Sequence, residues 1–146
     1  MIATAMARDS TSDPDPRWTV LYDADCGFCR TALALILSAD RDRRLRPVAL
    51  DTPEADWLLG DLVPEQRDAS WHLVSPAGRR ESAGAAGAPL LRLLPGGAVP
   101  AAALAKAPAT TQRAYRWVAE HRSTFSRALP AAVKDRATKL IERRSA

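Results

Sequence analysis

The two cysteines of this chain, Cys26 and Cys29, are separated by two residues and stand between two kinds of local structure. Residues 18–22 (Trp-Thr-Val-Leu-Tyr) are rich in β-forming side chains, whereas residues 31–37 (Thr-Ala-Leu-Ala-Leu-Ile-Leu) favour a helix. The pair is therefore expected where a strand passes into a helix. This placement constrains the fold, because the end of a strand and the start of a helix must meet around two thiols.

The start of a helix favours thiol reactivity. Its first backbone N–H groups are unpaired and its dipole is positive there, and both features stabilise a thiolate. Cys26 falls at the expected helix tip, while Cys29 begins an apolar stripe with i, i+3, i+4 spacing that continues to Leu37. We therefore expect an exposed, reactive Cys26 above a buried Cys29, which is the arrangement that thiol–disulfide exchange needs.

Three interpretations of the cysteine pair compete. A structural disulfide between Cys26 and Cys29 would close so short a loop that it would stabilise the chain very little. A zinc site usually has four ligands, and the other soft candidates, His72 and His121, stand at long, unpatterned spacings from the pair. The pattern favours the third interpretation, a reversible redox-active Cys26–Cys29 disulfide, with no metal and no separate cofactor.

Charged residues flank the pair and act in opposite directions. Arg30 would favour the thiolate, whereas Asp23 and Asp25 would disfavour it through like-charge repulsion, and the sequence leaves their balance open. Asp25 could instead cap the helix by accepting backbone N–H bonds. We take Cys26, Cys29, Asp23 and Asp25 as the candidate catalytic residues, with the two aspartates tuning the pair or assisting proton transfer.

The 146 residues suffice for one domain with a proper core and are too few for two comfortable ones. Residues 1–16 are rich in Asp, Ser, Thr and Pro and lack the features of a secretory signal, so we interpret them as a disordered leader. No run approaches the roughly 20 apolar residues of a membrane span. We expect a cytoplasmic protein, and in that reducing compartment a lone Cys-x-x-Cys is more often catalytic than structural.

The remaining patterns predict an order of elements. Pro47 indicates an edge strand or an irregular one, Thr52 and Pro53 indicate a helix start, and the Pro and Gly of residues 75–78 indicate a hairpin turn. The expected elements are strand 18–22, a helix from the cysteines onward, strand 45–50, helix 53–59, strands 70–74 and 79–82, and helix 83–94. The helical crossover between the first two strands implies that they pair in parallel. This is an α/β, thioredoxin-like order, βαβ-α-ββ-α with a mixed four-stranded sheet, and that fold carries its dithiol after the first strand.

Two stretches of the chain resemble a known family. Residues 22–29 (Tyr-Asp-Ala-Asp-Cys-Gly-Phe-Cys) resemble the signature of the DCC family of thiol-disulfide oxidoreductases, also called DUF393 and named for its Asp-Cys-Cys pattern. Residues 115–122 (Tyr-Arg-Trp-Val-Ala-Glu-His-Arg) are similar to a Tyr-Arg-hydrophobic stretch near the end of that family. The resemblance spans residues 17–125 and implies a thioredoxin-like fold and a dithiol activity. The positions that match its motif are Asp23, Cys26 and Cys29.

One departure from the wider thioredoxin pattern concerns the segment before the third strand. Thioredoxin-like enzymes usually place a cis-proline there, facing the dithiol, where it helps to hold a peptide. Asp68, Ala69 and Ser70 occupy that region here, and the nearest proline, Pro64, lies further upstream. The proline-dependent way of holding a peptide is therefore not expected, and a strand-addition contact through the backbone of Ala69 and Ser70 stays open.

Two histidines complete the set of titratable candidates. His121 lies on the apolar face of a helix expected over residues 111–125, which indicates a half-buried histidine; its alternative role is proton transfer to the Cys29 thiol. His72 stands in an alternating strand pattern and is expected to face solvent. Neither is taken as catalytic.

Positive charge gathers at the end of the chain. Residues 1–105 carry a net charge of −3, and residues 106–146 carry +7. We divide the chain into the leader, a dithiol domain over residues 17–128 and a basic C-terminal helix over residues 129–146. The apolar stripe of that helix indicates docking on the domain; as a functional patch it would suit an acidic partner or an anionic membrane. No nucleic-acid-binding motif accompanies it, so nucleic acid is not a predicted partner.

The sequence therefore predicts a thiol-disulfide oxidoreductase. Its expected partners are a disulfide-containing substrate, either a protein or a small molecule, and an upstream thiol reductant. The alternative is a non-enzymatic binding module that uses the fold and the basic helix to dock a partner, with a cysteine pair that is idle or holds a metal.

Overall fold

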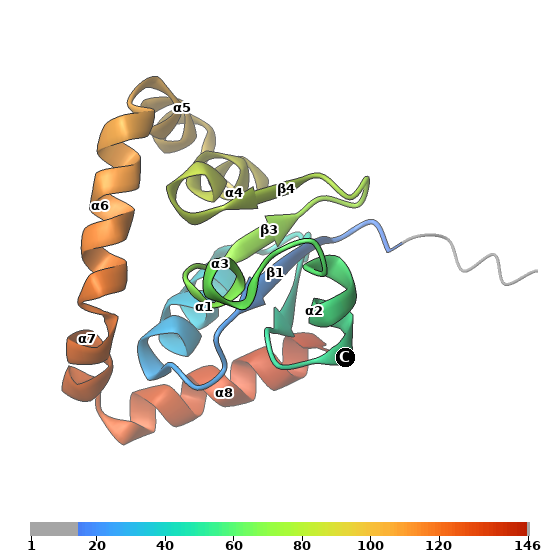
Figure 1. Cartoon of the computed structure of the whole chain (residues 1–146). Helices are drawn as coiled ribbons and strands as arrows, with labels where there is room; N and C mark the ends of the chain where they lie inside the picture. Colours follow the sequence, from blue (N-terminus) through green and yellow to red (C-terminus); the bar gives the residue numbers. More distant parts are fainter. Residues whose placement is uncertain (1–14, 146) are drawn as a thin grey trace, which may run out of the picture.

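The computed structural model describes residues 15–145. The predicted disordered leader, residues 1–16, lies outside this range except for its last two residues. Figure 1 shows how the strands and helices are arranged. The elements in chain order are β1 (Trp18–Tyr22), α1 (Gly27–Ala39), β2 (Leu45–Ala49), α2 (Pro53–Leu58), α3 (Pro64–Asp68), β3 (His72–Val74), β4 (Arg80–Ser82), the 3-10 helix η1 (Ala83–Ala86), α4 (Gly87–Leu93), α5 (Ala98–Lys106), α6 (Pro108–Glu120), α7 (Arg122–Ala128) and α8 (Ala131–Ser145).

The sheet has four strands in the order β2-β1-β3-β4. β1 pairs with β2 in parallel, with Trp18 opposite Leu45, and pairs with β3 in the antiparallel sense. β3 and β4 form the antiparallel hairpin. The predicted mixed four-stranded sheet, the parallel first pair and the edge position of the strand that holds Pro47 are confirmed. The arrangement is thioredoxin-like.

The two faces of the sheet bury different side chains, because successive residues of a strand point to opposite sides. On one face Val20 and Leu73 pack with residues of α1, α4 and α8, among them Leu37, Leu90 and Ile141. On the other face Leu21, Val48 and Val74 pack with Leu50, Ala55 and Leu59 around α2. The central strand β1 is thus covered on both sides, and α1 is held firmly against one of them (Figure 1).

Several predicted elements differ in extent from the structure. The strand expected over residues 70–74 is shorter, and the helix expected over residues 83–94 is divided into η1 and α4. The helix expected over residues 111–125 is two helices, because His121 leaves the helical conformation with φ −103° and ψ 6°. α3 and α5 were not predicted. The α5 sequence, Ala-Val-Pro-Ala-Ala-Ala-Leu-Ala-Lys, shows no apolar–polar period because it has almost no polar residues.

The prediction that His72 faces solvent is wrong. Its side chain is buried, with 1% of the residue exposed, and both ring nitrogens have partners. Nδ1 lies 2.6 Å from Ser82 Oγ, and Nε2 lies 2.9 Å from the carbonyl oxygen of Arg67. The strand pattern misled because β3 is covered on both faces, so alternation with Leu73 no longer marks a solvent side.

The basic helix α8 packs against α1 and completes the core. Ala137 and Ile141 are buried, as the predicted apolar stripe requires. Near its end, Arg144 donates to the carbonyl oxygen of Leu37 at 2.7 Å and to Asp40 Oδ2 at 2.6 Å. No helix within residues 15–145 is both long and apolar enough to cross a membrane.

The pair Arg144–Asp40 should contribute strongly to stability. The side chain of Asp40 is fully buried and that of Arg144 is 11% exposed, so removal of the guanidinium leaves a buried carboxylate without its charged partner. We expect Arg144→Met to lower the free energy of unfolding by about 3 kcal/mol, measured by urea denaturation. Arg143→Met, at the exposed neighbouring position, should change it by less than about 0.5 kcal/mol. Equal effects of the two substitutions would contradict this account.

Burial of His72 should make stability depend on pH. Burial lowers the pKa of His72 below its ordinary value of 6.5, so the unfolded chain binds this proton more readily than the folded one. The contribution of His72 to the free energy of unfolding is then fully present above about pH 7. The free energy of unfolding falls, by up to about 1.4 kcal/mol per pH unit, as the pH drops below about 6.5. We expect His72→Gln to flatten the curve of unfolding free energy between about pH 7 and 5, and His121→Gln to leave its slope in place. An unchanged slope in His72→Gln would refute the assignment.

Candidate active site

The two cysteines lie where β1 gives way to α1. Cys26 is the N-cap residue of α1, with an extended backbone, and its Sγ accepts the backbone N–H of Cys29 at 3.2 Å. Asp25, the predicted alternative cap, does not cap the helix. It is exposed, and its own N–H donates to Asp23 Oδ1 at 3.0 Å. The Cys26 sulfur takes the place of the side-chain oxygen of an ordinary N-cap residue. It accepts one of the backbone N–H groups that have no partner within the helix.

Gly27, between the cysteines, allows the C-terminal helices to approach the start of α1. A Cβ at this position would clash with the side chain of Lys134 in α8 and would lie 2.8 Å from Ser126 Oγ. Lys134 Nζ in turn donates to the carbonyl oxygen of Ser126 at 3.2 Å. Any other residue at position 27 would therefore require the side chains of Lys134 and Ser126 to move.

Both cysteines are free thiols and both are half-buried. The predicted contrast between an exposed Cys26 and a buried Cys29 is thus not found in the exposure of the two residues. It is found in the surroundings of Cys29, since burial and the neighbouring sulfur of Cys26 raise the pKa of Cys29 to about 12. The charge of Arg122 lowers this pKa and that of Asp23 raises it, but neither effect is the largest. Cys29 therefore holds its proton at neutral pH.

Arg122 is a site residue that the sequence analysis did not single out. It is the first residue of α7, and its Nη1 lies 3.9 Å from Asp23 Oδ2. The structure thus brings the predicted Asp23 and Cys29 together with a guanidinium from the far end of the chain. A signal existed, because Arg122 closes the stretch 115–122 that resembles the DCC family.

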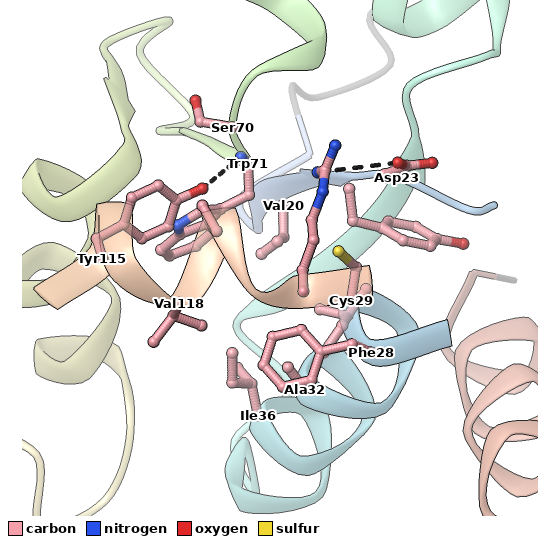
Figure 2. Close-up of a pocket in the computed structure, with 14 residues that line it drawn as sticks. Val20, Asp23, Phe28, Cys29, Ala32, Ile36, Ser70, Trp71, Tyr115 and Val118 are labelled. Atoms are coloured by element: carbon pink, nitrogen blue, oxygen red, sulfur yellow. Dashed lines mark hydrogen bonds and ion pairs between the residues drawn. The ribbon is translucent and has the colours of Figure 1, made fainter. Parts of the chain in front are cut away.

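A pocket of about 250 Å³ opens beside Cys29. Its walls come from α1, from the segment before β3 and from α6, as Figure 2 shows. Tyr115 Oη accepts the backbone N–H of Trp71 at 3.2 Å and joins two of these walls. Burial raises the pKa of Tyr115, so its hydroxyl keeps its proton. Cys29 belongs to the lining of this pocket and Cys26 does not.

A second hollow, of about 540 Å³, lies on the other side of Asp23 and Arg122 and is polar. Its carboxylates are Asp23, Asp25, Asp51, Asp56 and Asp68. Within residues 15–145 no group of three or more His, Cys, Asp or Glu side chains is close enough together to hold a metal ion. Asp23 and Arg122 thus form the boundary between an apolar and an acidic space.

Arg30 and His121 both have partners other than the thiols. The guanidinium of Arg30 donates to the carbonyl oxygen of Ala24 and so holds the loop before α1. His121 is half-buried, as predicted. Its ring stacks on Trp117 at a centroid distance of 4.4 Å, and its Nδ1 lies 2.7 Å from the carbonyl oxygen of the same residue. It is not part of the pocket lining at Cys29.

A Cys-x-x-Cys pair at the first strand–helix junction of this sheet defines a thioredoxin-like dithiol protein. Comparison with family models gives the family: the model of the DCC1-like thiol-disulfide oxidoreductases matches residues 20–128. The chain belongs to that family, which confirms the resemblance seen in the sequence. No curated protein and no solved structure matches the chain.

The raised pKa of Cys29 can be tested in the variant Cys26→Ser, where Cys29 is the remaining thiol. Burial, the largest cause of the shift, persists in this variant. We expect the rate of alkylation by iodoacetamide to keep rising with pH well beyond about 8.5, where an ordinary thiol is half ionised. The same variant unfolded in urea is the control and should show the ordinary midpoint. A midpoint near 8.5 in the folded variant would show that Cys29 is not shielded.

Proposed function

We propose that the protein is a thiol-disulfide oxidoreductase that exchanges electrons with a substrate disulfide through Cys26 and Cys29. The observation that carries this proposal is the contact between the two residues, in which Cys26 Sγ accepts the N–H of Cys29 at the start of α1. This backbone donor and the positive end of the helix stabilise negative charge on the Cys26 sulfur. Cys29, whose pKa is raised, keeps its proton. Cys26 is thus suited to attack the substrate, and Cys29 is suited to react in the second step.

The reaction takes place in two exchange steps. The Cys26 thiolate attacks one sulfur of the substrate disulfide, forms a mixed disulfide and releases the other half as a thiolate. Cys29 then loses its proton and attacks the Cys26 sulfur, which closes the Cys26–Cys29 disulfide and displaces the second thiolate. The pair gives up two electrons, which leave with the two substrate thiolates, and Cys29 gives up the one proton that the pair still holds. The released thiolates then take up protons from solvent according to their own pKa. An upstream thiol reductant restores the dithiol by the same steps in reverse.

Asp23 is the proposed acceptor of the Cys29 proton. It lines the pocket beside Cys29, and its charge is felt at that thiol. Arg122, 3.9 Å from Asp23, favours the Cys29 thiolate once the proton has left. Asp25 is exposed and donates its N–H to Asp23, so we assign it the weaker role of tuning the pair.

In the proposed reaction the Cys26–Cys29 pair is the only redox-active group. Electrons enter and leave as exchanged disulfides, so no metal and no bound cofactor takes part in the cycle. The cytoplasm is the proposed compartment, because its thiol pool keeps such a dithiol reduced and ready to act. The exposed basic face of α8, with Arg136, Lys139 and Arg143, is a proposed contact for an acidic partner.

Trapping the mixed disulfide tests the order of attack. In the variant Cys29→Ser the first step can occur and the second cannot, so we expect an adduct of one substrate half on Cys26. Intact mass spectrometry of the protein treated with a disulfide gives the mass, and peptide mapping gives the residue. Cys26→Ser is the matched control and should form at least about tenfold less adduct at pH 7, because Cys29 remains protonated. Adducts that form faster on Cys29 would reverse the roles of the two thiols.

A redox titration separates this function from the binding-module alternative. The protein is equilibrated in glutathione buffers of graded potential, alkylated and weighed. Loss of both thiols together, as one intramolecular disulfide at a potential that the cytosol reaches, supports the oxidoreductase. If no such disulfide forms and the double variant Cys26→Ser/Cys29→Ser still binds its cellular partners, the protein is a binding module.

A further inference from the structure

The pocket beside Cys29 is built for a small organic group. Its volume of about 250 Å³ is slightly smaller than the roughly 300 Å³ at which sites for drug-sized molecules begin. α1 forms one wall and α6 another, and the pocket between them is partly open to solvent (Figure 2). A compact substituent fits such a space.

Four aromatic side chains line the pocket. Tyr22 comes from the end of β1, Phe28 from α1, Trp71 from the segment before β3 and Tyr115 from α6. The backbone N–H of Trp71 donates to Tyr115 Oη, drawn as a dashed line in Figure 2, and so holds the Tyr115 side chain against the segment before β3. Aliphatic side chains such as Ile36 and Val118 complete the lining. Flat, apolar walls in this arrangement favour an aromatic ring as the occupant.

The pocket lining includes one positively charged side chain, that of Arg122. Its contact in the part of the chain that the structure describes is the long ion pair with Asp23 at 3.9 Å. Asp23 has a second partner, since its Oδ1 accepts the N–H of Asp25. The carboxylate is therefore better satisfied than the guanidinium, which has donors left for an anionic group of a ligand.

We propose that the substrate is a low-molecular-weight aromatic disulfide with an anionic substituent, whose ring lies in this pocket and whose charge faces Arg122. The proposal rests on the proposed function. Cys29 lines the pocket, and Cys26 Sγ lies 3.2 Å from the backbone nitrogen of Cys29, so a ring held there brings its disulfide to the start of α1, within reach of Cys26. Cys26 takes one arenethiol as a mixed disulfide while the other leaves as thiolate. Cys29, on losing its proton, closes the intramolecular disulfide and displaces the ring, so two electrons pass to two arenethiolates.

The rates of three probe disulfides distinguish a preference for an aromatic ring from a preference for negative charge. Dithiobis(nitrobenzoate) is aromatic and anionic, dithiodipyridine is aromatic and uncharged, and bis(hydroxyethyl) disulfide is neither. Each rate with the reduced protein is divided by the rate of the same probe with free glutathione, which removes intrinsic reactivity. We expect the normalised rate to be highest for dithiobis(nitrobenzoate), by about tenfold or more over bis(hydroxyethyl) disulfide.

Filling the pocket tests the place of the ring. Ala32 lines the pocket from α1, and Ala32→Phe should lower the rate with both aromatic probes by about tenfold while bis(hydroxyethyl) disulfide changes by less than about twofold. Ala39→Phe makes the same change at an exposed position of the same helix and should alter no rate. If Ala32→Phe does not fold, Ala119→Leu fills the pocket from α6, with the exposed Ala114→Leu as its control.

Removing the charge tests the anionic substituent. Arg122→Gln should lower the preference for dithiobis(nitrobenzoate) over dithiodipyridine by about tenfold, the size expected for one charge-assisted hydrogen bond. Arg116→Gln, an exposed position of α6, removes a charge of the same sign outside the pocket and controls for the general field. Arg122→Lys should restore part of the preference.

The outcomes distinguish this inference from the function on which it rests. If all three probes oxidise the dithiol but the filling and charge variants leave their relative rates unchanged, the pocket proposal falls and the oxidoreductase stands. If no probe oxidises the dithiol, the proposed function fails and this inference fails with it. A faster reaction with a disulfide-linked peptide, abolished by the same variants, would replace the small molecule with an aromatic side chain of a protein.

Discussion

The packing of α1 between the sheet and α8 determines where both thiols lie. Leu33 and Leu37 hold α1 against the sheet, and Ala137 and Ile141 are buried in α8, which packs against the same helix. At the start of α1, Gly27 permits the C-terminal helices to come close. At its end, Arg144 bonds to the carbonyl oxygen of Leu37 and to Asp40. Both ends of α1 are therefore in contact with the C-terminal helices, and the dithiol at its start is held in a defined place.

The position of α1 has a chemical consequence for the two thiols. Both lie at the start of the same helix, but their surroundings differ. Cys26 is the cap and accepts a backbone N–H, whereas Cys29 faces an apolar pocket that raises its pKa. A four-residue Cys-x-x-Cys motif cannot by itself produce this difference. It arises where α6 and Arg122 of α7 close over the side of α1 that carries Cys29.

Asp23 and Arg122 stand at a boundary between two unlike spaces. The pocket on one side is lined by aromatic and aliphatic groups, while the hollow on the other side gathers five aspartates. A carboxylate and a guanidinium at such a boundary act on Cys29 in opposite directions. Small changes in their pairing would therefore shift the proton balance of that thiol.

The sequence by itself determined the order of the four strands, the parallel first pair, the edge strand with Pro47 and the junction that holds the cysteines. These features depend on local propensity and on short-range patterns, which one chain segment contains in full. Tertiary structure alone decided the burial of His72, the break at His121, the cap by Cys26 in place of Asp25 and the pocket. The burial of His72 and the pocket depend on packing between separate segments, such as Trp71 with Tyr115 or Asp23 with Arg122, and no local pattern encodes such a meeting. The cap and the break are local in the chain, but the residue types alone do not fix them, because Asp25 and a continuous helix fit the local pattern equally well.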